Sequence, residues 1–134
     1  MHMFMKLYGR LLTKDRLRGC GYMEDSTCSL CNTEEETIDH LFFKCPYSSR
    51  VWTTMLQWQG IQRQTMTWAN ENEWAGKYYK GRSTTTELYK LILAGTLYYI
   101  WQERNDRIFK GEQRSEVILS KAIMQDVHWR GTSK

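Results

Sequence analysis

Three observations predict a small all-α domain that carries an irregular insert near its N-terminal third. The background is rich in Thr, Glu, Leu, Lys and Arg and holds a single proline, which favours helices over a β fold punctuated by turns. Apolar residues recur at helical spacing along most of the chain. Residues 28–45 break this pattern, because three cysteines and one histidine crowd into them. The length of 134 residues leaves room for one core, so we expect a single domain over residues 1–134.

Two helices are expected ahead of the cysteines. The first spans residues 3–12, in which apolar side chains follow the i, i+3, i+4 rhythm of an amphipathic helix. The second is a short helix that has Thr13 as its N-cap and ends at Gly19 or Gly21.

Two more helices are expected around the last of the clustered cysteines. Thr37 caps a short helix that stops at Cys45, because Pro46 disfavours helical angles in the residue before it. A longer helix follows over residues 48–59, and Gly60 is expected to end it.

The second half of the chain predicts three further helices. Residues 60–69 have no clear period and are expected to form a loop, and residues 70–81 form a helix after it. The longest helix begins near Thr85 and ends at Gly111; it is apolar nearly all round in its middle, which is typical of a buried central helix. A last helix has Ser115 as its cap. Its predicted apolar face consists of Val117, Ile118, Ile123, Met124 and Val127.

Composition also limits the compartments in which the chain is expected. No apolar run approaches the roughly 20 residues that span a bilayer, so we expect no membrane partner. The start lacks the apolar core and cleavage site of a secretory signal. The first fourteen residues contain no acid, as in a mitochondrial presequence, but a helix folded into the domain explains them as well. We expect an intracellular protein of the nucleus or cytoplasm, whose reduced cysteines favour metal binding over disulfides.

The most specific motif is Cys28-x2-Cys31-x8-His40-x4-Cys45. A C-x2-C turn lets two thiolates converge on one cation, and three thiolates with one imidazole match the closed tetrahedral form of structural zinc sites. On a continuous helix, the side chains of His40 and Cys45 would point roughly 140° apart. The break at Pro46 lets Cys45 turn back toward the metal. We therefore predict one structural Zn²⁺ in an irregular zinc-binding insert.

Other interpretations of the cysteines remain open. They could be buried thiols without a metal. A redox pair would need a thioredoxin-like βαβ context, which the sequence lacks, and a catalytic zinc would need an open ligand position beside a base or substrate pocket. Cys20 stands outside the motif and is expected to be a packed thiol. Asp39 or another acidic neighbour is expected to fix the tautomer of His40.

Residues 28–52 read CSLCNTEEETIDHLFFKCPYSSRVW. This stretch resembles the zinc-binding domain that follows the reverse transcriptase in plant non-LTR (LINE-type) retrotransposons. The family pattern is C-P-x-C, an acidic run with Glu-Thr, H-L-F-F-x-C-P and then V-W. It is matched at Cys28, Cys31, Glu36, Thr37, His40, Leu41, Phe42, Phe43, Cys45, Pro46, Val51 and Trp52, while Ser29 replaces the family's proline. Residues 9–17 resemble the basic lead-in of the family, and residues 100–109 resemble a segment that follows in such elements.

The resemblance implies a zinc module over about residues 20–52 and a helical remainder over residues 53–134, as a stand-alone or domesticated fragment of a retroelement. For the parent element it implies binding of RNA or DNA, and Lys and Arg would neutralise the phosphates. The expected contact residues are Arg10, Lys14, Arg16, Arg18, Arg104 and Arg107, together with Lys6 and Lys110. For Arg104 we also expect a structural ion pair with an acidic neighbour. Aromatic residues beside the metal site, namely Phe42, Phe43 and Trp52, are expected in the core rather than stacked on bases.

The charge distribution leaves two functions open. The net charge is +4; residues 1–23 carry five Lys or Arg against Asp15, whereas residues 24–43 carry six acids and no base. The basic arm permits a nucleic-acid surface, although a solvated basic helix face explains it as well. The acidic stretch disfavours nucleic acid near the metal. It supports the alternative, a domesticated protein–protein interaction module with a regulatory or selfish-element role.

Catalysis is not expected. The sequence offers no nucleophile–base pair, no carboxylate dyad and no glycine loop that would cradle a phosphate. No polymerase motif such as Tyr-x-Asp-Asp is present. We therefore expect a binding module without a small-molecule substrate.

Overall fold

The structure of the chain is a computed structural model that describes residues 11–21 and 25–132. The regular elements in these residues are α2 (Lys14–Gly19), the π-helical turn η1 (His40–Lys44), α3 (Pro46–Trp58), α4 (Trp68–Tyr78), α5 (Thr84–Phe109) and α6 (Glu116–Thr132). The described part of the chain contains no strand, only an isolated bridge between Thr27 and Glu35. The predicted all-α fold class is confirmed.

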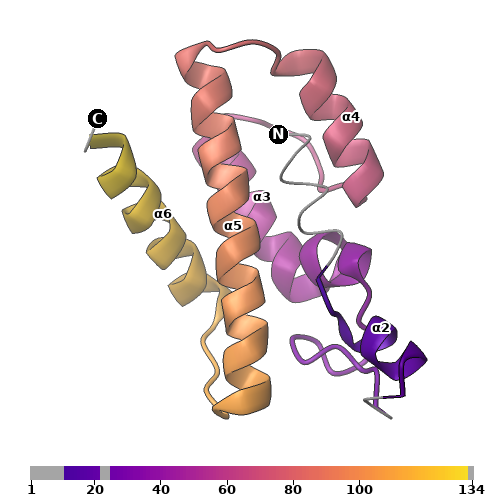
Figure 1. Ribbon diagram of the computed structural model, residues 1–134. Helices are drawn as coiled ribbons and strands as arrows, with labels where there is room; N and C mark the ends of the chain where they lie inside the picture. The colour runs from indigo at the N-terminus through magenta and orange to yellow at the C-terminus, as the bar shows by residue number, and fades with distance from the viewer. Residues whose placement is uncertain (1–10, 22–24, 133–134) are drawn as a thin grey trace.

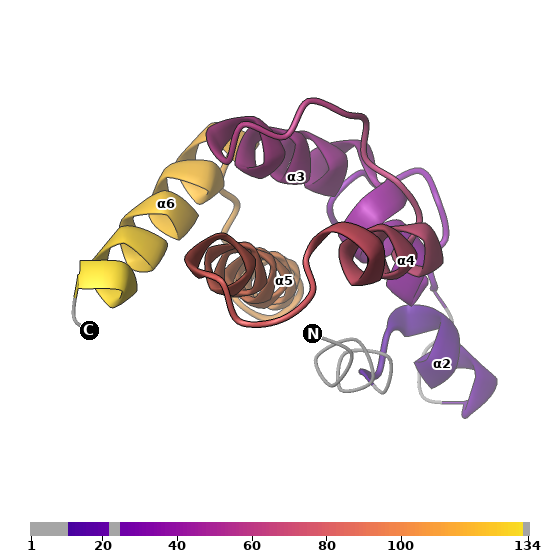
Figure 2. The ribbon, with the colours of Figure 1, turned by 90° about the horizontal axis from the view of Figure 1, so that it is seen from above.

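The long helix α5 runs through the middle of the molecule (Figure 1). Seen from above, α6, α3 and α4 form an arc around it (Figure 2). The turn η1 packs against α3 and α5. The irregular segment that holds the cysteines, together with α2, therefore lies beside the end of α5 that leads into α6 (Figure 1).

The core is built from the apolar faces of η1, α3, α5 and α6. On α5 the buried side chains recur at helical spacing from Tyr89 to Ile100, as the sequence predicts. Each fully buried aliphatic or aromatic side chain contributes about 1.5–3 kcal/mol relative to its exposed state. The largest fully buried side chains are Trp52, Tyr89, Phe42, Leu41, Met55, Leu56, Ile92, Leu93, Leu97, Ile100, Ile123 and Glu36. The expectation that Phe42, Phe43 and Trp52 belong to the core is confirmed.

Helix boundaries differ from the prediction where caps decide them. The helix expected from residue 48 begins at Pro46, since the fixed φ of proline suits the first helical position. The helix expected from residue 70 begins at Trp68, because the Thr67 hydroxyl oxygen accepts a hydrogen bond from the Asn70 backbone amide at 3.3 Å. For the helix expected over residues 3–12, residues 3–10 lie outside the described part of the chain, and residues 11 and 12 are not helical.

The buried face of α6 differs from the predicted one. Val117 and Ile118 are 59% and 55% exposed, whereas Leu119 is buried with Ile123 and Val127. Residues 119, 123 and 127 are four apart and share one face, and Val117 lies about 200° away from Leu119 at 100° per residue. The prediction was wrong for Val117 and Ile118 because apolar residues occupy both faces of this helix.

None of the helices in the described residues combines the length and apolarity that crossing a bilayer requires.

Candidate metal centre

Backbone hydrogen bonds fold residues 26–36 into a compact loop that carries the first two cysteines. The Cys28 amide donates to the Glu34 carbonyl at 2.8 Å, and the Glu36 amide donates to the Ser26 carbonyl at 2.7 Å. Between these contacts the Asn32 amide donates to the Cys28 carbonyl at 2.8 Å, and Asn32 has a left-handed φ of 59°. This tight turn places the side chains of the C-x2-C motif on one side of the loop.

The histidine and the third cysteine come from the next element. The Thr37 hydroxyl oxygen accepts a hydrogen bond from the His40 amide at 3.0 Å, which confirms Thr37 as the helix cap. The Cys45 amide then donates to the His40 carbonyl at 2.7 Å, a spacing of five residues that makes the turn π-helical. Cys45 itself is extended, with φ −60° and ψ 134°, and Pro46 begins α3 directly after it. The predicted break before the proline is confirmed, whereas the π-helical widening was not predicted.

The structure brings Cys28, Cys31, His40 and Cys45 together, with their ligand atoms within 4.8 Å of one another. The Sγ atoms of Cys28 and Cys45 are 3.9 Å apart, and the Cys31 Sγ is 3.3 Å from the His40 Nε2. A tetrahedral zinc with bonds of about 2.3 Å to sulfur and 2.05 Å to nitrogen requires about 3.8 Å and 3.6 Å for these pairs. A disulfide would require about 2.05 Å between sulfurs, and Cys28, Cys31 and Cys45 are all free thiols.

The four ligand residues are largely shielded from solvent. Cys28 and Cys45 are fully buried and His40 is 8% exposed, while Cys31 is half-buried. Three sulfurs and one nitrogen fill all four positions of a tetrahedral ion, so no position is left for a water or a substrate. The arrangement therefore fits a structural site.

Hydrogen bonds prepare the sulfurs to act as ligands. The Leu30 amide donates to the Cys28 Sγ at 3.4 Å, and the Thr33 hydroxyl donates to the Cys31 Sγ at 3.4 Å. The Cys28 thiol donates to Cys45, which raises the pKa of Cys28 and lowers the pKa of Cys45; burial further raises the pKa of Cys28. A zinc ion would replace the shared proton, since metal ligands bind as thiolates.

The predicted role of Asp39 as the partner of the His40 ring is not what the structure shows. One Asp39 oxygen accepts a hydrogen bond from the Trp68 amide at 2.7 Å, at the start of α4. The other lies 3.2 Å from the Lys44 ammonium. Asp39 therefore connects the metal centre to α4 rather than orienting the imidazole.

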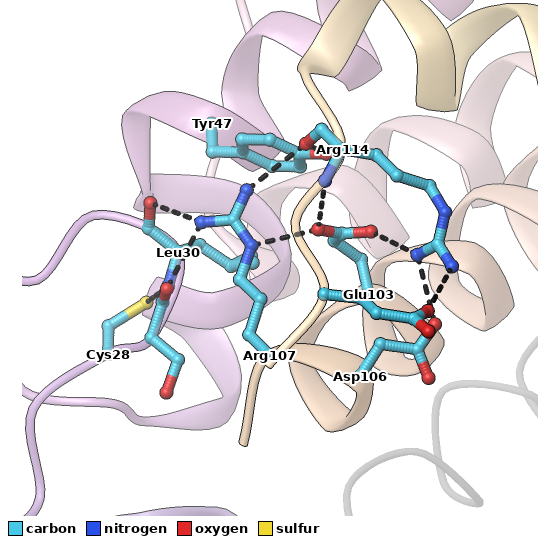
Figure 3. Close-up of polar contacts among 9 residues, drawn as sticks. Cys28, Leu30, Tyr47, Glu103, Asp106, Arg107 and Arg114 are labelled. Carbon is cyan, nitrogen blue, oxygen red and sulfur yellow. Dashed lines mark hydrogen bonds and ion pairs between the residues drawn. The ribbon is translucent and has the colours of Figure 1, made fainter. Parts of the chain in front are cut away.

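An arginine of α5 holds the C-x2-C turn in place (Figure 3). Arg107 Nη1 donates to the carbonyls of Ser29 and Leu30 at 3.1 and 3.2 Å, and both of these residues lie between the paired cysteines. Arg107 Nε donates to the fully buried carboxylate of Glu103 at 2.8 Å, and its guanidinium lies 4.8 Å from the Tyr47 ring centroid. Sequence reasoning missed Glu103, because an acid inside an apolar helix gives no local sign of its partners.

The same carboxylate anchors the connection between α5 and α6. Glu103 accepts hydrogen bonds from the Arg114 amide at 2.9 Å and from the Arg114 Nη1 at 2.7 Å (Figure 3). The Arg114 carbonyl accepts from Arg107 and from the Tyr47 hydroxyl at 2.9 Å. The metal-centre loop, α3, α5 and the start of α6 therefore meet in one polar network.

These ligands and their spacing can be compared with known proteins. Residues 1–52 match the family model described as zinc-binding in reverse transcriptase. The resemblance predicted from the sequence is confirmed over this part of the chain, and the family is a zinc-binding one. Searches of curated proteins and of solved structures find no match.

The zinc-binding family and the geometry agree on the cofactor. The Cys₃His group has the number and type of ligands to hold one zinc ion, as predicted. When bound, the ion supplies a cross-link between the loop of residues 26–36 and the segment of η1 and Cys45. The matched family is a zinc-binding domain rather than a catalytic one.

Three of the eight predicted nucleic-acid contacts have partners within the fold. Lys14 is 8% exposed, and its ammonium donates to the Thr27 carbonyl at 2.7 Å. Arg104 is 4% exposed and pairs with Glu36, as its expected structural role requires. Arg107 is held in the network described above. A phosphate would have to displace these partners, and leaving a buried charge without its partner is costly.

The remaining predicted contacts differ in their surroundings. Arg16 and Arg18 are exposed on α2. Lys110 is exposed and lies 3.7 Å from Asp106. Lys6 and Arg10 lie outside the described residues. Cys20, predicted to be packed, is exposed at the end of α2, since the backbone turns there into Gly21 with a φ of 82°.

Proposed function

We propose that this chain is a non-catalytic zinc module, derived from the C-terminal region of a plant retrotransposon reverse transcriptase, that binds RNA or DNA. The observation that carries the proposal is the uncompensated positive charge of α2. Arg16 and Arg18 contact only a backbone carbonyl and a serine hydroxyl, each at 3.3 Å, and neither meets a carboxylate in the described part of the chain. Guanidinium groups of this kind bind phosphates in forked geometry.

The metal centre supports this surface mechanically. Lys14 at the start of α2 donates through its ammonium to the Thr27 carbonyl and to the Ser29 hydroxyl at 2.8 Å, and both acceptors belong to the metal-centre loop. The Lys14 amide donates to Glu36 at 2.7 Å. Zinc would thus fix the loop against which α2 packs, and the two arginines would be presented on an ordered helix.

A titration of the zinc-loaded full chain tests the proposal. Fluorescence anisotropy with labelled single- and double-stranded RNA and DNA, at several salt concentrations, should show binding that weakens as salt rises. The variant R16E/R18E should lose most of this binding. The matched control K121E/R130E makes the same change in net charge on α6 and should retain it. Equal binding by the two variants, or no binding by the wild-type chain at low salt, contradicts the proposal.

A second candidate function, interaction with another protein, is favoured by the acidic rim of the metal centre. Asp25, Glu34 and Glu35 are exposed around the loop and would repel phosphates. A basic segment of a protein partner suits the same rim. Affinity capture from the native tissue with wild-type chain and with E34K/E35K tests this alternative. It is supported only by a partner that the wild type retains and the variant loses.

A further inference from the structure

A second uncompensated positive surface lies at residues 77–83, which comprise the last two residues of α4 and its connection to α5 and which we call the α4–α5 turn. Its sequence, KYYKGRS, contains three bases and no acid. Lys77, Lys80 and Arg82 are all exposed, and none has an ion pair within the described residues. Most other exposed cations do have an acidic partner: Lys44, Arg50, Lys110 and Arg130.

The α4–α5 turn also presents an aromatic face. Tyr78 is 60% exposed, and the Lys77 ammonium lies 5.4 Å from its ring centroid. The next residue, Tyr79, stacks on the buried Tyr89, with ring centroids 4.7 Å apart and an interplanar angle of 6°. Tyr79 therefore anchors the turn to the core, while Tyr78 lies on the surface. The ring centroids of Tyr78 and Trp74 are 5.2 Å apart.

The backbone of the turn is fixed by its own hydrogen bonds. The Ser83 Oγ accepts from the Thr86 amide at 3.1 Å and caps α5, and the Thr86 hydroxyl donates to the Lys80 carbonyl at 3.3 Å. Gly81 provides the left-handed residue that the turn requires, with a φ of 80°. The cations and the exposed ring are thus held by an ordered scaffold, which reduces the entropy that binding must overcome.

A groove of about 280 Å³ runs beside Tyr78. It is lined by Met66, Asn70, Glu73, Trp74, Lys77 and Tyr78. The Glu73 carboxylate disfavours a phosphate inside the groove, while the aromatic rings and the Asn70 amide suit a base. Phosphates would accordingly bind outside the groove, at the exposed Lys80 and Arg82.

We propose that the α4–α5 turn binds a single-stranded segment of RNA or DNA, with one base stacked on Tyr78 and the neighbouring phosphates at Lys77, Lys80 and Arg82. An exposed aromatic face recognises an unstacked base, which a duplex does not offer. The inference rests on the proposed nucleic-acid function and adds a contact surface at the end of the molecule away from α2 (Figure 1).

The test uses the zinc-loaded full chain and labelled 12-nucleotide oligo-U and oligo-dT, each also as a duplex with its complement. Since stacking of a base on an aromatic ring contributes about 1–3 kcal/mol, Y78A should weaken single-strand binding about tenfold or more and leave duplex binding nearly unchanged. Y78F should retain wild-type affinity. The control Y98A removes another exposed tyrosine, 51% exposed on α5, and should bind as the wild type does.

A second experiment tests the phosphate contacts with the triple variant K77Q/K80Q/R82Q, which removes the three positive charges of the turn. Removal of three phosphate contacts should reduce the slope of log K against log salt by about two on a single strand. The control R50Q/K121Q/R130Q makes the same charge change on α3 and α6 and should keep the wild-type slope. The oligo-U and oligo-dT arms show which nucleic acid is preferred.

The outcomes separate this inference from the proposed function. If Y78A and the triple variant bind like the wild type while R16E/R18E loses binding, the α4–α5 turn is not a contact surface, although the proposed function stands. If the wild-type chain binds neither single nor double strands at low salt, both fail. Loss of binding in Y98A equal to that in Y78A also overturns the inference, because the effect would then not be specific to the turn.

Discussion

The guanidinium of Arg104 on α5 donates hydrogen bonds to both carboxylate oxygens of Glu36 beside the metal centre. Its Nε lies 3.0 Å from one oxygen and its Nη2 lies 2.9 Å from the other, and the Glu36 carboxylate is fully buried. One of these oxygens also accepts the Lys14 amide at 2.7 Å. Three stretches that are separated in the sequence therefore meet at one carboxylate. The zinc module and the helical remainder are joined through it.

Replacement of Arg104 by glutamine should destabilise the zinc-loaded chain by about 3–5 kcal/mol, because it leaves the Glu36 carboxylate buried without its charged partner. Urea unfolding followed by circular dichroism measures the change. The control is R130Q, which breaks an ion pair of the same type on the surface of α6, where Arg130 is 64% exposed. An exposed pair contributes about 0–1 kcal/mol. If both variants lose the same stability, Glu36 and Arg104 do not join the two parts of the chain.

The helices and the ligand set were predictable because their signals are local. Helical periodicity, Thr37 as a cap and Pro46 as a break depend on neighbours within a few residues. The spacing of the cysteines and His40 similarly limits the chemistry before any fold is known. The structure adds the π-helical turn that carries the chain from His40 to Cys45, which no local pattern in the sequence indicates.

Partners of buried charges were not predictable in the same way. Glu36 and Arg104 are separated by 68 residues, and nothing in either segment identifies the other. The sequence likewise did not show that Lys14 and Arg107 have partners within the fold, since a basic residue at the surface and one inside a polar network look alike in a sequence. Conversely, the sequence did not predict the exposed cations of residues 77–82 as a binding surface, because only the structure shows that they lack acidic partners.

Replacement of Arg107 by lysine should weaken zinc binding. Arg107 reaches two carbonyls of the C-x2-C turn with one nitrogen while another holds Glu103, and an ammonium cannot reproduce this fork. Residues that orient metal ligands in this way typically contribute 10–100-fold to affinity, so we expect R107K to raise the zinc Kd by about tenfold or more. Competition with a chromophoric chelator measures the Kd.

Two further measurements distinguish positioning of the turn from a general loss of stability. Cobalt in place of zinc should show altered thiolate-to-metal absorption in R107K. The control R63K disturbs a different ion pair, between Arg63 and the fully buried Glu71, and should lower the melting temperature without changing the cobalt spectrum. An unchanged Kd and spectrum in R107K would assign Arg107 to the fold alone.

Removal of the metal should unfold the N-terminal part of the chain and lower the stability of the rest. The ligands come from two segments that zinc would cross-link, the loop of residues 26–36 and the segment of η1 and Cys45, and binding of structural zinc is coupled to folding. We expect a zinc chelator, C28S or H40A to lower the melting temperature by more than 10 °C, since a loss of about 1 kcal/mol already shifts it by several degrees. C20S is the matched control, because Cys20 is exposed outside the cluster. A chelator without effect on a chain shown to contain zinc contradicts this prediction.

Stability should fall as pH rises above about 10, the ordinary pKa of tyrosine. Burial is the main cause that raises the pKa of Tyr47 and of Tyr89, and the nearby carboxylates of Glu103 and Glu71 raise these values further. Because the folded-state pKa lies above the unfolded one, the unfolded chain loses these two protons first, and stability present below pH 10 is lost at higher pH. Above pH 10, each tyrosine lowers the free energy of unfolding by about 1.4 kcal/mol per pH unit. Urea unfolding of the zinc-loaded chain between pH 8 and 11 should therefore show a smaller slope in Y47F than in the wild type, and equal slopes would contradict this prediction.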